Sequence, residues 1–495
     1  MVLRKTGSTQ ARGRLGFEHP SETYLYILFI LAVFGLTFAW SLTNQPPAGP
    51  DENMRFMIPN YIYNHGRLPN GYDPEVRNEL WGISYAFYPM LSYIISALFM
   101  KIVSLFSTSN MALICAARFT GVVFTTATAA LIPHMTKRLF KDGRRWMMNA
   151  LVMFLPELLF VGTYVNNDAM AIFTTAVILY AWTRYLDEGW TRKNCIILAV
   201  GMGFCLLSYY NAYGWVLMSF FLFLASHLLD DADEELKERA MRMLKSGLVV
   251  AGIVLVIALW TFVRNGILYD GDILGLKVTK ISGEMYAIDE LKPSLHWTPE
   301  KEGMSYKDLL LYQAGGWPHN WTIMTIYSFI CAFGHYTIFM EEWMYKIYVG
   351  FIFFGFVFTV IPFRRNFLWK NRKVEKSVYL REQSSDVSSR KVITAYRGIN
   401  GKGLYNTFMF IGMLIPLVLL FIYAYYNDLQ AQGRYMVSST IAVMYFVTMG
   451  YGWFMEKVIR SERIRNVIYG GIALIWVFNT VLSYFRLILP TAGWT

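Results

Sequence analysis

The sequence predicts an all-α polytopic membrane protein with about 11 membrane-spanning helices. Of the 495 residues, 55% are hydrophobic and only 16% are charged, whereas an average soluble domain has about 25% charged residues. Many apolar runs approach the roughly 20 residues that a helix needs to cross a bilayer. The net charge of +11 fits a cytoplasmic excess of Lys and Arg, so we expect no nucleic acid partner.

Each predicted span is an apolar run between polar or basic segments. In chain order, the expected spans are 24–43, 112–134, 146–163, 169–186, 194–210, 214–230, 246–264, 343–362, 404–425, 435–455 and 466–486. If the basic clusters between them lie inside the cell, the N-terminus is inside and the C-terminus outside. The segment 84–106 then cannot span, and its tyrosines and Lys101 suit a helix at the membrane surface.

The same topology predicts the organisation of the chain. The N-terminal segment 1–23 is cytoplasmic, and 24–264 forms a transmembrane module that includes an outer loop at 44–111. A large outer loop follows at 265–342, and 343–495 is a second transmembrane module with a cytoplasmic segment at 363–402. No P-loop, GxSxG or Rossmann motif occurs, which argues against direct use of ATP and against serine-hydrolase chemistry.

Three acidic residues near the predicted outer face are candidates for catalysis. Asp51 and Glu52 directly follow the first span, and two carboxylates at a water–lipid boundary can supply a general base or a metal site, although loop acids are often only solvated. Arg55 is four residues after Asp51 and would share its helix face. Asp168 lies in a short loop on the same predicted side, where it would join the site, cap the next helix, or do both.

Other residues are candidates for substrate binding. Arg434 would stand at lipid headgroup level, where a guanidinium binds phosphate or only snorkels, and Gly433 would let a ligand approach closely. The candidate phosphate- and lipid-binding residues are Arg434, Arg118, Arg55, Gln432 and Tyr435, and those for other substrate contacts are His65, Glu75 and Tyr88. The sequence leaves a cofactor open; if a divalent metal such as Mg or Mn takes part, Asp51 and Asp168 would bind it.

An ordered set of short motifs resembles the GT-C superfamily of membrane glycosyltransferases. The matching segments are Asp51-Glu52-Asn-Met-Arg55, Phe87-Tyr88-Pro89-Met-Leu91, Ala117-Arg118-Phe119 and Asn167-Asp168. Two later segments, Ser328-Phe-Ile-Cys-Ala-Phe-Gly334 and Gln432-Gly-Arg-Tyr435, are similar to signatures of a little-characterised bacterial branch. Tyr88-Pro89-Met90 stands where two other branches have a PPL tripeptide, which leaves the acceptor open.

The resemblance implies a GT-C-like fold and an inverting glycosyltransferase of the bacterial cytoplasmic membrane. Its partners would be a polyprenyl-phosphate sugar donor, membrane lipid, and a cell-envelope glycan or lipid that accepts the sugar on the outer face. Asp51 would be the general base or a metal ligand, Glu52 would support it, Asp168 would brace the site and Arg434 would hold the donor phosphate.

Two other functions remain open at this point. A lipid-linked sugar flippase or other transporter would need polar residues in the middle of several spans. A polysaccharide polymerase or ligase would use basic residues of the 265–342 loop, among them Lys277, Lys280, Lys292, His296 and His319, with Arg264 at its edge.

Overall fold

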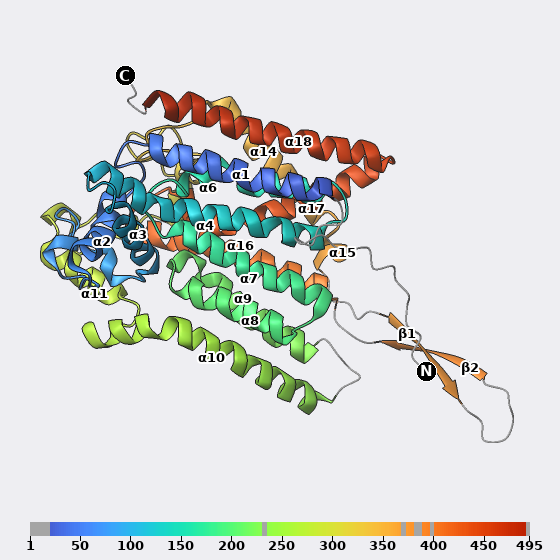
Figure 1. The fold of residues 1–495 in the computed structure, drawn as a ribbon. Helices are drawn as coiled ribbons and strands as arrows, with labels where there is room; N and C mark the ends of the chain where they lie inside the picture. The colour runs from blue at the N-terminus through green and yellow to red at the C-terminus, as the bar shows by residue number, and fades with distance from the viewer. Residues whose placement is uncertain (1–19, 230–234, 368–372, 381–388, 397–399, 492–495) are drawn as a thin grey trace.

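The computed structural model describes residues 20–229, 235–367, 373–380, 389–396 and 400–491. Most of the predicted cytoplasmic N-terminus therefore lies outside the described residues. The described chain is helical apart from one β-hairpin, and its long helices run side by side in one elongated bundle (Figure 1). The predicted all-α, multi-pass membrane architecture is thus confirmed for the bundle.

Eight helices of the described chain are long and apolar enough to cross a membrane. They are α1 (Pro20–Thr43), α4 (Asn110–Leu139), α7 (Asp168–Glu188), α9 (Tyr213–Leu229), α10 (Leu236–Leu268), α14 (Glu342–Val360), α16 (Gly401–Tyr426) and α18 (Glu462–Ser483). Each coincides with one of the 11 predicted spans.

The other three predicted spans are shorter or interrupted in the structure. The first is broken into α5 (Arg144–Met153) and α6 (Pro156–Val161), since Leu155 is extended, as expected before a proline. The second is the 15-residue α8 (Arg192–Leu206). The third, α17 (Thr440–Val458), begins late because Gly433–Ser439 forms the 3-10 helix η5. All three pack in the bundle, but the count of 11 spanning helices is not confirmed.

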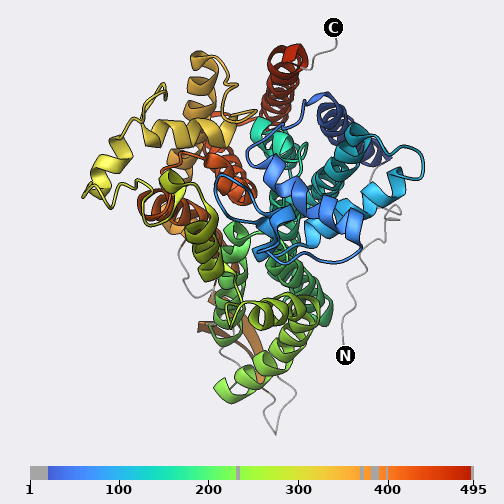
Figure 2. The same cartoon turned by 90° about the vertical axis from the view of Figure 1, so that its left-hand side faces the viewer.

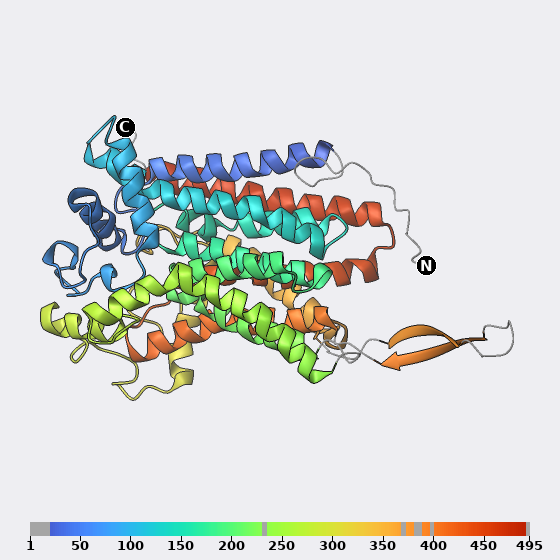
Figure 3. The same cartoon turned by 60° about the horizontal axis from the view of Figure 1, so that its bottom comes forward.

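The two large loops lie together at one end of the bundle. The first contains α2 (Glu52–His65) and α3 (Leu91–Val103), and the second contains α11 (Leu276–Tyr286), α12 (Tyr306–Leu311) and α13 (Trp321–Ile330). Figures 2 and 3 show the two loops side by side, and backbone N–H of Ile288 donates to the carbonyl of Leu80 at 3.1 Å. With 13 residues, α3 is too short to cross about 30 Å of hydrocarbon.

The opposite end of the bundle carries α15 (Phe363–Phe367) and the hairpin, whose strands β1 (Lys373–Leu380) and β2 (Ser389–Tyr396) are antiparallel. The sequence prediction gave this segment no strands. Its β-branched residues, such as Val374 and Val392, favour strands and could have predicted the hairpin. Short helical turns complete the fold: η1 (Pro74–Val76), η2 (Tyr85–Phe87), η3 (Tyr210–Ala212), η4 (Asp289–Leu291), η6 (Tyr484–Ile488) and η7 (Leu489–Thr491).

Candidate active site

Asp51 lies where the chain turns from α1 into α2, at the loop end of the bundle. Its φ of 62° places it in the left-handed region, which Asp adopts more readily than most residues that carry a Cβ. The Oδ2 atom accepts hydrogen bonds from Arg434 Nη2 at 2.9 Å and from the Tyr85 hydroxyl at 3.1 Å. Oδ1 accepts none from the described residues, and the side chain is 35% exposed. One carboxylate oxygen is thus held in place while the other is free to face a ligand.

The charges around Asp51 keep it ionised. Burial alone would raise its pKa, but the positive charges of Arg434 and Arg55, with hydrogen bonds from Arg434 and Tyr85, lower the pKa below its ordinary value. Burial raises the pKa of Tyr85 well above its ordinary value, so its phenol stays protonated and can donate. Asp51 is therefore a carboxylate at neutral pH.

Glu52 turns into the protein, where it forms a clamp with Arg118. Arg118 Nε and Nη2 donate to the two carboxylate oxygens of Glu52 at 2.7 and 2.8 Å. The same oxygens accept from the backbone N–H groups of Ala48 and Val165, while Arg118 Nη1 donates to two carbonyls at the end of α1. Glu52 is 2% exposed and Arg118 fully buried, and every side-chain nitrogen and oxygen of the clamp is already hydrogen-bonded within the protein.

Arg55 projects from α2 into the protein with part of its guanidinium unpaired. Nη1 donates to Asn167 Oδ1 at 2.7 Å and to Asp168 Oδ2 at 3.3 Å. The guanidinium carbon lies 4.6 Å from the ring centre of Tyr85 and 5.5 Å from that of Tyr209. Nε and Nη2 are buried and have no hydrogen-bond partner among the described residues. Leaving such donors unsatisfied is costly, which points to an anionic ligand at this position.

Asp168, at the start of α7, is 3% exposed and faces Arg55 rather than capping its own helix. The nearby capping contact comes from Asn166, whose Oδ1 accepts from the backbone N–H of Ala169 at 3.1 Å. Asp168 therefore faces the candidate site, whereas Asn166 caps α7.

Arg434 joins the first loop to η5. Nη2 binds Asp51, Nε donates to Gln432 Oε1 at 2.9 Å, and Nη1 lies 3.2 Å from both the carbonyl of Pro50 and the hydroxyl of Tyr164. Because the side chain is 1% exposed and all three of its nitrogens are engaged, a phosphate could bind it only by sharing its donors. Two nitrogens of Arg55 are equally buried but have no partner among the described residues.

Gly433 allows close approach of a helix rather than of a ligand. A Cβ here would lie 2.1 Å from the carbonyl oxygen of Thr325 in α13, and the backbone N–H of Gly433 donates to Ser328 Oγ at 2.7 Å. The expectation that Gly433 makes room for a ligand is therefore wrong. Instead, the two late sequence motifs contact each other, and Tyr435 follows with its ring 5.3 Å from the guanidinium carbon of Arg434.

The remaining predicted substrate residues fall into two places. Tyr88 lies beside the site, with its ring centre 5.8 Å from that of Tyr85. His65 Nε2 and Glu75 Oε2 are 2.9 Å apart on the surface, and neither is hydrogen-bonded to Asp51 or an arginine of the site. The structure thus pairs His65 with Glu75 but does not bring them to Asp51.

Asp51 and Asp168 do not form a divalent cation site as arranged here, because each faces an arginine. Within the described ranges there is no group of three or more His, Cys, Asp or Glu side chains that could hold a metal. The basic residues of the second loop do not gather either: Arg264 binds the carbonyl of Pro69, and the partners of Lys292, His296 and His319 are Asp289, Asp428 and Glu342 respectively.

Aromatic side chains complete the site, and the sequence did not assign them this role. Tyr85 was interpreted only as an interfacial residue, yet it contacts both Asp51 and Arg55. Tyr209, in Ser-Tyr-Tyr-Asn-Ala, carries no recognisable motif. The packing of η2 against α2 places Tyr85 over Arg55, and Tyr209, just before η3, reaches the same guanidinium.

No protein-family model and no curated protein sequence matches the chain. Its structure is similar to that of the oligosaccharyltransferase AglB from Archaeoglobus fulgidus, solved with an inhibitory peptide and a dolichol-phosphate, with a TM-score of 0.50 and 13% identity. The match covers 96% of this chain but only 57% of AglB. ArnT from Cupriavidus metallidurans, solved with undecaprenyl phosphate, matches with a TM-score of 0.48 and 11% identity, over 95% of this chain and 74% of ArnT. The likeness to AglB shows that the two chains share a membrane-protein fold.

Proposed function

We propose that the protein is a membrane glycosyltransferase that moves a sugar from a polyprenyl-phosphate carrier to a cell-envelope acceptor. The observation that carries the proposal is the juxtaposition of Asp51, which has one free carboxylate oxygen, with the unpaired nitrogens of buried Arg55. A base and an anion-binding group side by side are what this transfer needs. AglB, which has the same fold, was solved with a dolichol-phosphate, and this supports a lipid-phosphate donor.

The donor phosphate would bind Arg55. Its Nε and Nη2 can bind two phosphate oxygens together, which is the preferred geometry for a guanidinium. The hydroxyl of Tyr93 is buried beside Arg55, so it can donate to the same group. Asp168 would act as a positioning residue, because its contact with Nη1 orients the guanidinium.

Asp51 would act as the general base in a single displacement. The acceptor hydroxyl oxygen forms a bond to the anomeric carbon while the bond from that carbon to the phosphate oxygen breaks. The phosphate leaves with the bonding electron pair as polyprenyl phosphate, and the hydroxyl proton passes to Asp51 Oδ1. The positive charge of Arg55 stabilises the leaving phosphate, and one displacement inverts the anomeric centre.

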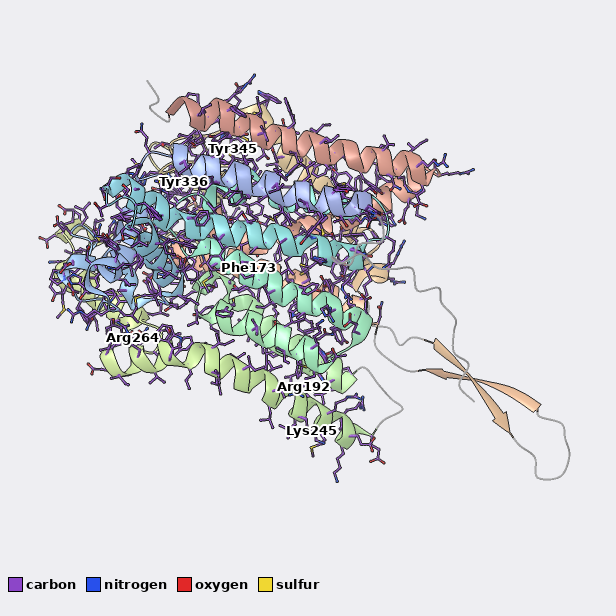
Figure 4. All side chains as sticks on the ribbon, viewed as in Figure 1. Phe173, Arg192, Lys245, Arg264, Tyr336 and Tyr345 are labelled. Atoms are coloured by element: carbon purple, nitrogen blue, oxygen red, sulfur yellow. The ribbon has the colours of Figure 1, made fainter. Side chains whose placement is uncertain are left out.

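The site would face outward in a bacterial cytoplasmic membrane. Basic residues support this orientation, since Arg192 and Lys245 lie toward the hairpin end of the bundle, away from the loops (Figure 4). By the positive-inside rule the hairpin end would be cytoplasmic, and Asp51 would then lie on the outer side.

The test is transfer by the purified full-length protein in lipid nanodiscs, using a panel of radiolabelled polyprenyl-phosphate hexoses and cell-envelope extracts as acceptors. Wild type should release polyprenyl phosphate and label the acceptor, and Asp51→Asn should lower the rate about 10²–10⁴-fold. Glu75→Gln, in the same loop but away from the site, is the matched control. Transfer by Asp51→Asn at the wild-type rate would refute the base. Translocation of the labelled donor across vesicles without transfer would favour the flippase.

A further inference from the structure

Tyr85 contacts both reactive groups of the proposed site. Its hydroxyl donates to Asp51 Oδ2 at 3.1 Å, and its ring centre lies 4.6 Å from the guanidinium carbon of Arg55. Asp51 and Arg55 are four residues apart in the chain, a spacing at which opposite charges on a helix commonly pair. Instead, Asp51 pairs with Arg434 at 2.9 Å and Arg55 pairs with Asp168 at 3.3 Å. Tyr85 therefore bridges two separate ion pairs.

Both contacts of Tyr85 leave the reactive atoms free. The hydroxyl binds Oδ2 of Asp51, whereas Oδ1, the proposed proton acceptor, has no hydrogen-bond partner among the described residues. The face of an aromatic ring attracts a positive charge but offers no lone pair for a strong hydrogen bond. The ring thus holds Arg55 without occupying Nε and Nη2, which a carboxylate in its place would bind in competition with phosphate. A tyrosine can therefore hold a base and an anion-binding group in place while both keep the atoms that a substrate needs.

The turn that carries Tyr85 is well anchored. Tyr85 begins η2, and Ser84 caps this turn by accepting a hydrogen bond from the backbone N–H of Ala86 at 3.1 Å. Ser84, Ala86 and Phe87 are all buried, and the ring of Tyr88 packs 5.8 Å from that of Tyr85. Neighbours that are fixed by packing and hydrogen bonds are what a residue needs in order to position others precisely.

A second ring approaches the same guanidinium. The ring centre of Tyr209 lies 5.5 Å from the guanidinium carbon of Arg55. Asp51, however, accepts its side-chain hydrogen bonds from Tyr85 and Arg434. A comparison of the two tyrosines can therefore separate the effect of a ring on Arg55 from the effect of a hydroxyl on Asp51.

We propose that Tyr85 is a positioning residue that fixes the base Asp51 relative to the phosphate-binding Arg55. The inference adds a residue to the proposed mechanism and rests on the proposed function. The hydroxyl acts on the base, because it orients the carboxylate and its hydrogen bond helps to lower the pKa of Asp51. The ring acts on the donor site, because it stabilises the charge of buried Arg55. The two parts of this side chain should therefore affect different kinetic parameters.

The test compares Tyr85→Phe with Tyr85→Leu in the full-length protein in nanodiscs. Tyr85→Phe keeps the ring, so it should lower kcat about threefold to tenfold and move the acid limb of the rate profile to higher pH, with an unchanged KM for the polyprenyl-phosphate hexose. Tyr85→Leu should also raise this KM about fivefold or more. Tyr209→Leu should raise the KM without moving the acid limb. Tyr63→Leu is the matched control, because this ring lies 4.6 Å from the ammonium of Lys101 rather than beside Arg55.

Two further measurements do not require transfer. Binding of geranylgeranyl phosphate, followed by native mass spectrometry, should weaken about fivefold or more in Tyr85→Leu and keep its wild-type strength in Tyr85→Phe. A water-soluble carbodiimide reacts with protonated carboxyl groups, and Asp51 is 35% exposed. The pH midpoint of Asp51 modification, mapped by mass spectrometry, should therefore rise in Tyr85→Phe.

Three results would overturn the positioning role of Tyr85: equal effects of the Phe and Leu variants on every parameter, wild-type binding of geranylgeranyl phosphate in Tyr85→Leu, or an unmoved midpoint of Asp51 modification in Tyr85→Phe. If wild type transfers sugar from no donor while the differences in binding and midpoint are present, the proposed function fails and the positioning of Asp51 and Arg55 by Tyr85 stands. The two failures can thus be distinguished.

Discussion

Replacing Glu52 by alanine should destabilise the protein strongly, although Glu52 adjoins the proposed base. The carboxylate accepts two hydrogen bonds from Arg118 and two from the backbone. Its loss leaves the charge of a fully buried arginine without a partner, and breaking such a pair typically costs about 3–5 kcal/mol. The two backbone N–H groups lose their acceptor as well, so we expect a loss at the upper end of this range.

The same reasoning predicts coupling between the two partners. A double variant, Glu52→Leu with Arg118→Leu, removes both charges together and should lose less free energy of unfolding than the sum of the two single losses. Glu75→Ala, which removes one partner of an exposed pair with His65, should cost less than about 1 kcal/mol. The free energy of unfolding is measured by denaturant titration of the purified protein in detergent micelles. Equal losses for Glu52→Ala and Glu75→Ala, or strict additivity in the double variant, would refute the clamp.

Three further predictions concern Asp51, Arg434, Arg55 and Gly433. The pKa of Asp51 is lowered in the folded protein, so the carboxylate stays ionised at and above its ordinary pKa of about 3.9. Its contributions to catalysis and to folding stability should therefore be lost only as the pH falls through the lowered pKa of the folded state. Arg434→Gln removes the main lowering charge while burial persists, so the acid limb of the rate profile should move to higher pH; an unmoved limb would contradict this account. Arg55→Lys keeps the charge but loses paired contact with phosphate, and should raise the KM for the donor about tenfold, or about 1.4 kcal/mol, with a smaller effect on kcat; an unchanged KM would exclude the phosphate role. Gly433→Ala forces η5 away from α13 and should cost about 1–3 kcal/mol of stability, whereas Gly471→Ala, which meets no atom within 4 Å, is the neutral control in the same thermal-unfolding measurement.

The fold could be predicted because its signal is local. A helix that crosses a bilayer needs a continuous apolar run, and eight of the predicted runs form such helices. The sequence prediction failed where the local pattern was insufficient. Pro156 breaks one predicted span, and η5 delays the start of α17. The strands β1 and β2 form within a polar segment for which no strand was predicted.

The sequence by itself determined the membrane architecture, the acidic pair after the first span and the arginines that could accompany it. It could not determine which charges pair, because adjacent residues on one turn can face opposite environments. The tertiary structure decided that Asp51 faces the open side, whereas Glu52 is buried against Arg118. It also decided that all three nitrogens of Arg434 are engaged, whereas two nitrogens of Arg55 have no partner among the described residues. Those pairings join α2 to residues more than 60 positions away in the chain, and only packing of the whole bundle brings such distant side chains into contact.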